Sequence, residues 1–152
     1  MLFLATGLTV LATIGIDIGS ANSVISTARR GGVDVLVNEA SQRQTPSMVA
    51  FNAQRRLLGQ SAAAQQTSSP ADCVGEIKTL LGLTLAEARR LDPLPAAMLV
   101  EAEGGAGECV VEVKLRGEVR RFTATQLLAM LLHQLQVCAE RELGAGANDC
   151  TI

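Results

Sequence analysis

The sequence predicts a mixed α/β domain, and three observations support this prediction. The apolar run "IGIDI" at residues 14–18 has the alternating isoleucines of a buried strand. Valines alternate through residues 33–37 directly after the Gly31-Gly32 pair, which is typical of a hairpin turn followed by a strand. Residues 125–143 carry apolar side chains at helical spacing. With 152 residues, the chain has the length of one compact domain.

Composition limits the classes of function. Hydrophobic residues make up 48% of the chain and aromatic residues only 2%, so we expect a sizeable core built from aliphatic side chains. The net charge is −2 and no block of basic residues occurs, which argues against nucleic-acid binding. The four cysteines form no Cys-x-x-Cys pair, and the single histidine, His133, lies on a different helical turn from Cys138. We therefore expect reduced thiols in a cytosolic protein rather than a zinc site.

Residues 1–13 carry no charge and leave two interpretations open. The segment is too short to span a bilayer as a helix, so we expect no stable membrane insertion. One interpretation is a loose N-terminal extension or a misplaced start, with the protein in the cytoplasm. The other is the apolar part of a signal peptide that lacks its basic start, which would place the protein in the lumen of the endoplasmic reticulum.

The first half of the chain predicts short strands followed by short helices. Strands are expected at 14–18, 23–29, 33–37 and 47–51, with a polar loop at 42–46. Helices are expected at 60–66, 71–81 and 85–91, the second ending near Gly82 and the third capped by Thr84. Pro93 and Pro95 then interrupt regular structure.

The second half predicts three strands, a long helix and a final strand. The three strands are expected at 98–101, 108–116 and 118–122, with a turn at Gly117 and an ordinary loop at 104–107. Thr123 and Gln126 have the spacing of a capping box, which opens the helix. Its buried face is predicted to contain Leu128, Leu131, Leu132, Leu135, Cys138 and Ala139. Gly144 is placed to end the helix, and a last strand begins near Asp149.

The stretch "IGIDIGSANS" is the main candidate for chemistry. Asp17 lies near the end of the first predicted strand, and Gly19, Ser20 and Ala21 form a turn narrow enough for backbone N–H groups to approach an anion. A carboxylate beside an anion is repelled unless a cation lies between them, so the pattern suits Mg²⁺ held through water next to a phosphate. The alternative is a solvated aspartate beside an ordinary turn.

Several segments, taken in order, resemble one protein family. They are "IGIDIGSANSV", "GGVDVLVNEASQRQTPSMVAF", "RLLGQSAA", "EIKTLLG" and "FTATQLLAMLLHQLQVCAERELGAGANDCTI". Together they resemble the beginning of the DnaK-type, seventy-kilodalton heat-shock chaperones, over nearly all of residues 14–152. The stretches "ARRGGVDVLVNEASQRQTPS" and "RRFTATQ" are more similar to the large, one-hundred-and-ten-kilodalton members, which are chaperones that also act as nucleotide-exchange factors.

This resemblance implies an actin-like ATPase fold of the ribonuclease H-like type, with ATP or ADP and Mg²⁺ bound between two lobes. Residues 14–152 would form part of the first lobe, with a small α+β subdomain inserted at about 83–122. The rest of the nucleotide-binding domain, with the second phosphate loop and the adenosine pocket, would follow Ile152. We therefore expect the chain alone to bind ATP very weakly or not at all, and to self-associate.

The resemblance also assigns roles to five residues. Asp17 would lie near the water shell of the metal, and Gly19, Ser20 and Ala21 would form the first phosphate loop. Lys78 would lie near the terminal phosphate, where its charge stabilises phosphoryl transfer, so that Asp17 and Lys78 would be the catalytic residues. Without the resemblance, the residues indicate only a solvated lysine on an amphipathic helix at position 78.

The pattern departs from the family at the phosphate loop. DnaK-type members have two threonines after the glycine, whereas this chain has Ser20 and Ala21, and Ala21 lacks a hydroxyl that would bond a phosphate oxygen. Nucleotide binding is therefore better supported than hydrolysis. Thr45 and Ser47, on either side of Pro46, are expected to be structural.

Two functions follow from these observations. One is the ATP-binding module of a heat-shock chaperone or exchange factor, which assists unfolded client proteins together with partner chaperones. The other is a short interaction module without ATPase activity, or a decayed copy of such a chaperone.

Overall fold

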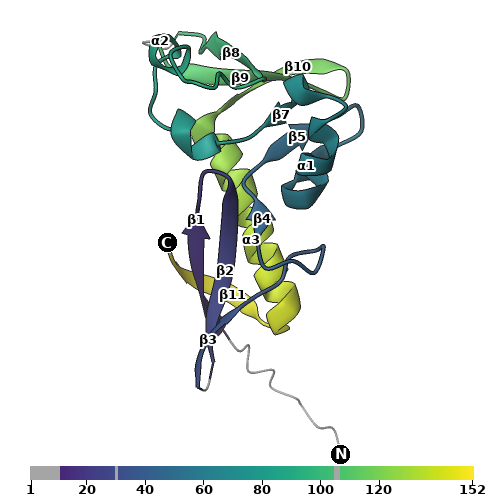
Figure 1. Cartoon of the computed structure of the whole chain (residues 1–152), viewed down its shortest axis with the longest axis vertical. Helices are drawn as coiled ribbons and strands as arrows, with labels where there is room; N and C mark the ends of the chain where they lie inside the picture. The colour runs from purple at the N-terminus through teal and green to yellow at the C-terminus, as the bar shows by residue number, and fades with distance from the viewer. Residues whose placement is uncertain (1–10, 30, 105–106) are drawn as a thin grey trace, which may run out of the picture.

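The computed structural model describes residues 11–29, 31–104 and 107–152 (Figure 1). Its strands are β1 (Leu11–Ile18), β2 (Asn22–Arg29), β3 (Gly32–Val35), β4 (Thr45–Pro46), β5 (Val49–Phe51), β6 (Arg56–Leu58), β7 (Cys73–Val74), β8 (Met98–Glu101), β9 (Cys109–Leu115), β10 (Glu118–Thr123) and β11 (Gly146–Thr151). Its α-helices are α1 (Gly59–Gln66), α2 (Leu85–Ala88) and α3 (Ala124–Leu143), and two 3₁₀ helices are η1 (Pro70–Asp72) and η2 (Ile77–Leu80). The prediction of a mixed α/β architecture is confirmed.

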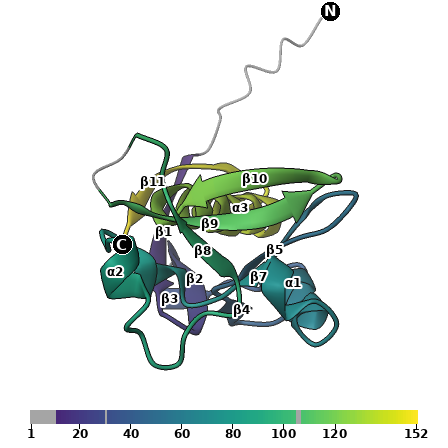
Figure 2. The ribbon, with the colours of Figure 1, turned by 90° about the horizontal axis from the view of Figure 1, so that it is seen from above.

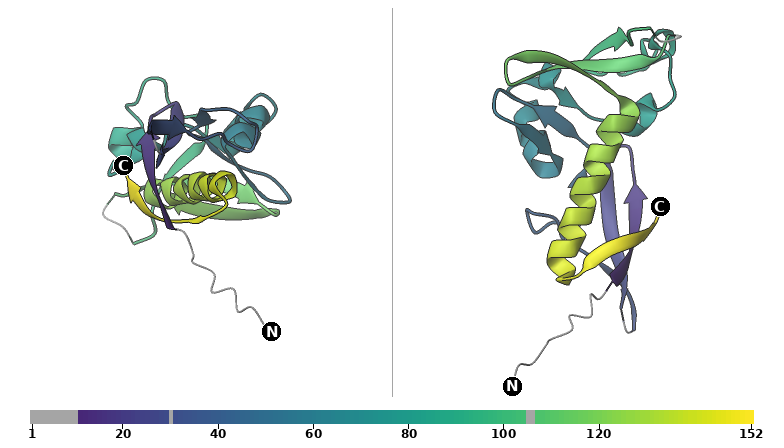
Figure 3. Two further views of the ribbon diagram at one scale, coloured as in Figure 1. Left: turned by 90° about the horizontal axis from the view of Figure 1, so that it is seen from below. Right: turned by 180° about the vertical axis from the view of Figure 1, so that it is seen from behind.

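The largest sheet is built around the first strand. Its strand order is β11-β1-β2-β3, and the short β4 also pairs with β2. β1 runs antiparallel to β2 and parallel to β11, so the last described strand of the chain lies beside the first. The long helix α3 lies across this sheet and leads into β11 (Figure 3). Figure 1 shows the C-terminal end of β1, the strand that contains Asp17, near the middle of the molecule.

Two three-stranded sheets lie at the other end of the molecule (Figure 1), one in the order β6-β5-β7 and one in the order β10-β9-β8. Figure 2 shows this end from above. The second sheet lies within the region where a small subdomain is expected, and α2 packs against its strands β8 and β9. Helix α1 packs on β5. Phe51 and Phe122 stack between the two sheets, with their ring centroids 5.1 Å apart.

Helix α3 joins two hydrophobic clusters. Its first turn contributes Ala124 and Leu127 to a cluster with the two small sheets, and later turns contribute Leu131 and Leu135 to a cluster with β1 and β2. Leu128 packs against both clusters. The helix begins with the predicted capping box and ends at Gly144, whose φ of 62° is in the left-handed region that favours glycine.

The predicted cap at Thr84 and the predicted first strand are also present, although the strand is longer than expected. Thr84 and Glu87 form a complete capping box at α2. The backbone N–H and the hydroxyl of Thr84 each donate a hydrogen bond to the Glu87 carboxylate. These two bonds lower the pKa of the Glu87 carboxyl. β1 begins at Leu11, earlier than the predicted strand, while residues 1–10 of the predicted N-terminal extension lie outside the described residues. The same is true of residues 105–106 in the predicted 104–107 loop.

The predicted helix at 71–81 is wrong. The segment forms η1, β7 and η2 in succession. Cys73 and Val74 are buried and pair with β5, so tertiary pairing overrides the local helical pattern. Glu76 then has a φ of 48°, in the left-handed region, which ends any continuous helix before η2.

The polar and alternating segments differ from the prediction in smaller ways. Thr45–Pro46 lies within the predicted loop but pairs with β2, and β5 begins only at Val49. β6 was not predicted. In β3, Val33 and Val35 are exposed, because this strand lies at the edge of its sheet and Leu36 is the residue that reaches the core.

None of the helices in the described part of the chain has both the length and the apolar character needed to span a bilayer.

We predict that Leu131→Ala destabilises the protein by about 2–5 kcal/mol, because Leu131 is fully buried where α3 crosses the large sheet. Val137→Ala, on the exposed side of the same helix, should cost less than about 1 kcal/mol. Urea unfolding followed by circular dichroism measures both values. Equal losses for the two variants would show that this face of α3 does not hold the fold together.

Candidate functional site

Asp17 is exposed near the C-terminal end of β1. Ile14 and Ile16 on the same strand are buried, so the alternation of the strand directs Asp17 away from the core. The strand is held in register on this side by Val24 of β2, which pairs with Asp17. The carboxylate is therefore carried on a fixed backbone and remains in contact with solvent.

The turn after β1 is narrow, as predicted. The Gly19 N–H donates to the carbonyl oxygen of Asn22 over 3.1 Å, and a Cβ at Gly19 would collide with that same oxygen. The Gly19 N–H is thus occupied by the turn itself. Ser20 and Ala21 are exposed, and within the described part of the chain neither N–H donates a backbone hydrogen bond. These two N–H groups are the ones available to an anion.

Ser47 holds both ends of this turn. Its hydroxyl donates to the Gly19 carbonyl over 2.7 Å, and its N–H donates to the Ala21 carbonyl over 2.9 Å. The buried Ser23 hydroxyl lies 2.8 Å from the Ser47 hydroxyl and donates to it, since the Ser47 hydrogen is directed at Gly19. Ser47 is therefore a positioning residue for the turn, a more specific role than the structural one expected from the sequence.

Lys78 lies beside the same turn although 60 residues separate it from the end of β1. Its ammonium donates to the Ile18 carbonyl over 3.0 Å. Lys78 is exposed on η2, whose neighbouring residues Ile77 and Leu80 are buried in the core and fix the backbone. The predicted helix is absent, but the structure does bring Lys78 to the end of β1.

Two hollows adjoin the turn. Asp17 and Lys78 line one of about 310 Å³, together with Ile16, Ile18, Leu81, Leu128 and Ile152. Ser20 and Ala21 line another of about 360 Å³, together with Ser47, Met48 and Glu76. Among the ion pairs of the described residues, none joins Asp17 to Lys78, so both charges face solvent.

This set of groups fits a magnesium–phosphate ligand. A lysine ammonium and two backbone N–H groups complement phosphate oxygens, and an exposed carboxylate suits a hydrated cation. The described residues contain no group of three or more His, Cys, Asp or Glu side chains placed to hold a metal ion directly.

Cys73 also lines the hollow beside Ser20 and Ala21. Burial raises the pKa of its thiol, and the negative charge of Asp72 adds to this effect. Burial likewise raises the pKa of Cys109 and of Cys138, whereas Cys150 is exposed. The thiol in the hollow is thus kept protonated and is a poor nucleophile.

We predict that Ser47→Ala increases hydrogen exchange at the Gly19 N–H, whose hydrogen bond to the Asn22 carbonyl closes the turn. The substitution leaves the Gly19 carbonyl and the buried Ser23 hydroxyl without a partner, which should cost about 1–3 kcal/mol. Exchange measured by NMR tests this, with Ser61→Ala on the exposed side of α1 as the control. Unchanged exchange at the turn would contradict the positioning role.

We also predict that Cys150 reacts first with a disulfide reagent at about pH 8, and that the three buried thiols react slowly. Because burial raises the pKa values of these three thiols, their thiolate fractions, and therefore their reaction rates, should increase only at higher pH. A Cys150→Ser variant identifies the fast phase. A fast phase that survives in this variant would disprove the assignment.

Comparison with known proteins identifies the family. Residues 13–152 match the model of the family described as Hsp70 protein. The chain is 33% identical over 142 residues to heat shock 70 kDa protein 16 of Arabidopsis thaliana, and the match covers 93% of this chain and 19% of the relative. It is 35% identical over 144 residues to heat shock protein hsp88 of Neurospora crassa, and this match covers 93% of this chain and 20% of the relative. The chain spans about a fifth of the length of these curated relatives, and it belongs to the Hsp70 family of heat-shock proteins.

Proposed function

We propose that this chain provides one wall of an Mg·ATP-binding site in a heat-shock chaperone or in a nucleotide-exchange factor of the same family. The observation that carries the proposal is the hydrogen bond from the Lys78 ammonium to the Ile18 carbonyl. It brings a positive charge next to the Asp17 carboxylate and the turn at residues 19–21, although these elements are far apart in the sequence.

Each group has a distinct role in this proposal. The Lys78 ammonium has three hydrogens, of which one is used by Ile18, so two remain for oxygens of a terminal phosphate. The N–H groups of Ser20 and Ala21 bind further phosphate oxygens. Asp17 accepts hydrogen bonds from the water shell of Mg²⁺. Together these groups would orient a bound Mg·ATP at this wall of the site.

Binding is better supported than hydrolysis at this turn. Ala21 offers a phosphate its N–H but no hydroxyl, so one polar contact available to a threonine is missing. The assistance of unfolded clients, the exchange of nucleotide on partner chaperones and a cytoplasmic location are proposals that rest on family membership.

We predict that Mg·ATP, titrated into the ¹⁵N-labelled chain, shifts the NMR signals of residues 17–21, 47 and 78 selectively. Affinity should be in about the millimolar range, because one exposed wall leaves the charges screened by water. Lys78→Ala should weaken binding about three- to tenfold, and Lys114→Ala, which changes an exposed lysine on β9, should leave it unchanged. Shifts spread over the surface, or equal losses in the two variants, would contradict the proposed site.

We predict that Asp17→Asn weakens binding of Mg·ATP more than binding of metal-free ADP. The reason is that Asp17 acts on the metal's water shell and makes no direct contact with phosphate. The same NMR titration with and without Mg²⁺ measures the difference, and Asp34→Asn, at an exposed position in β3, is the matched control. Equal losses with and without Mg²⁺ would remove Asp17 from the metal site.

A further inference from the structure

A second candidate site lies where two turns meet beside the stacked phenylalanines of the small sheets. The β9–β10 turn docks on the turn at 52–55 between β5 and β6 through Arg116. Its N–H donates to the Asn52 carbonyl over 3.4 Å, and its side-chain Nε donates to the Gln54 carbonyl over 3.3 Å. The two turns thus form adjoining walls of a single groove.

Both walls have well-defined backbones. The Asn52 side-chain oxygen accepts hydrogen bonds from the N–H groups of Gln54 and Arg55, over 2.9 and 2.8 Å. Arg116 and Gly117 are the two central residues of the β9–β10 turn, and both have positive φ values, 55° and 81°. One common class of two-residue hairpin turn requires a positive φ at both of these positions. An arginine in the left-handed region is uncommon, and here this conformation lets its side chain reach the neighbouring turn.

The groove has a volume of about 570 Å³ and concentrates positive charge. Four arginines line it, Arg55, Arg56, Arg116 and Arg120, together with one acidic residue, Glu118. Glu118 pairs with Arg120, while among the described residues no carboxylate lies within ion-pair distance of the other three guanidinium groups. The whole chain has a net charge of −2, so this is a local positive region on an acidic protein.

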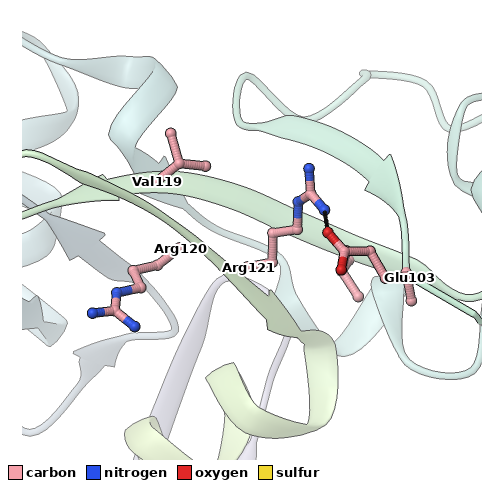
Figure 4. Close-up of a pocket in the computed structure, with 6 residues that line it drawn as sticks. Glu103, Val119, Arg120 and Arg121 are labelled. Carbon is pink, nitrogen blue, oxygen red and sulfur yellow. Dashed lines mark hydrogen bonds and ion pairs between the residues drawn. The ribbon is translucent and has the colours of Figure 1, made fainter.

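A neighbouring hollow of about 600 Å³ provides a contrast. Figure 4 shows Arg121 directed at Glu103, while Arg120 extends away from them, as expected for adjacent residues of a strand. Arg121 also pairs with Glu112 over 3.0 Å, and hydrogen bonding to Glu112 raises the pKa of Arg121. The charge in that hollow is therefore balanced within the protein, whereas the charge in the groove is not.

We propose that this arginine groove binds an acidic peptide segment of a partner protein. Guanidinium groups on both walls suit carboxylates, and the partly buried Leu115 and Phe122 offer apolar surface between them. A nucleic acid is disfavoured because the one aromatic ring in the groove is stacked on Phe51 and is not free to stack on a base. The groove shares no lining residue with either hollow beside the turn at residues 19–21, so this binding is separate from the proposed nucleotide site.

The test is fluorescence anisotropy with the 152-residue chain and a fluorescein-labelled octapeptide of alternating glutamate and leucine. In an extended peptide of this pattern, the leucines face one side and the carboxylates the other. A lysine–leucine octapeptide and a uridine octanucleotide are the control ligands. We expect the acidic peptide to bind and its affinity to fall as salt is raised.

Matched variants locate the site. The double variant Arg55→Gln/Arg56→Gln should weaken binding of the acidic peptide about tenfold, because each exposed arginine contributes a modest charge interaction. Arg89→Gln/Arg90→Gln removes another adjacent pair of exposed arginines, away from the groove, and should change binding less than about twofold. Circular dichroism confirms that both variants are folded.

Three results would overturn the proposal. One is the absence of binding of the acidic peptide up to about 1 mM. Another is an equal loss in the two double variants, which would indicate attraction by general charge. The third is tighter binding of the uridine octanucleotide than of the peptide, which would indicate a nucleic-acid site.

Discussion

The structure depends on the burial of one face of α3. Leu127 lies in the cluster formed with the small sheets, and Leu131 lies in the cluster formed with the large sheet, so one rigid helix fixes the two parts relative to each other. Because η2 packs on α3 through Ile77 and Leu80, the same helix determines where Lys78 lies. Leu128 contacts both clusters and also lines the hollow that contains Asp17 and Lys78. The candidate site is therefore a consequence of how α3 packs.

The sequence predicted those features that neighbouring residues determine. The strand ending at Ile18, the turn at Gly19 and the capping box at Thr123 each follow from a few adjacent side chains, and the structure contains all three. The segment around Lys78 was predicted to be a helix, because its apolar spacing is compatible with one. The pairing of Cys73 and Val74 with β5 prevents the helix, and no local pattern reveals that pairing.

The candidate sites show the same division. Asp17 was proposed from its local pattern and Lys78 from the resemblance to the heat-shock family, whereas the role of Ser47 depends on contacts with residues 24 and 28 positions earlier in the chain. The arginine groove is an even clearer case. Its basic residues come from two hairpins about 60 positions apart, so the sequence contains no basic block although the fold creates a basic surface.

A neutral framework carries the charges of the proposed nucleotide site. The buried polar residues near the turn are Ser23, Asn38, Thr45 and Ser47, and hydrogen bonds satisfy each of them. Within the described residues, no buried side-chain nitrogen or oxygen lacks a partner. Burying a charge costs far more than burying a hydrogen-bonded hydroxyl. Neutral groups can therefore fix the turn while Asp17 and Lys78 stay hydrated. These two charged side chains lose bound water only when a ligand of complementary charge binds.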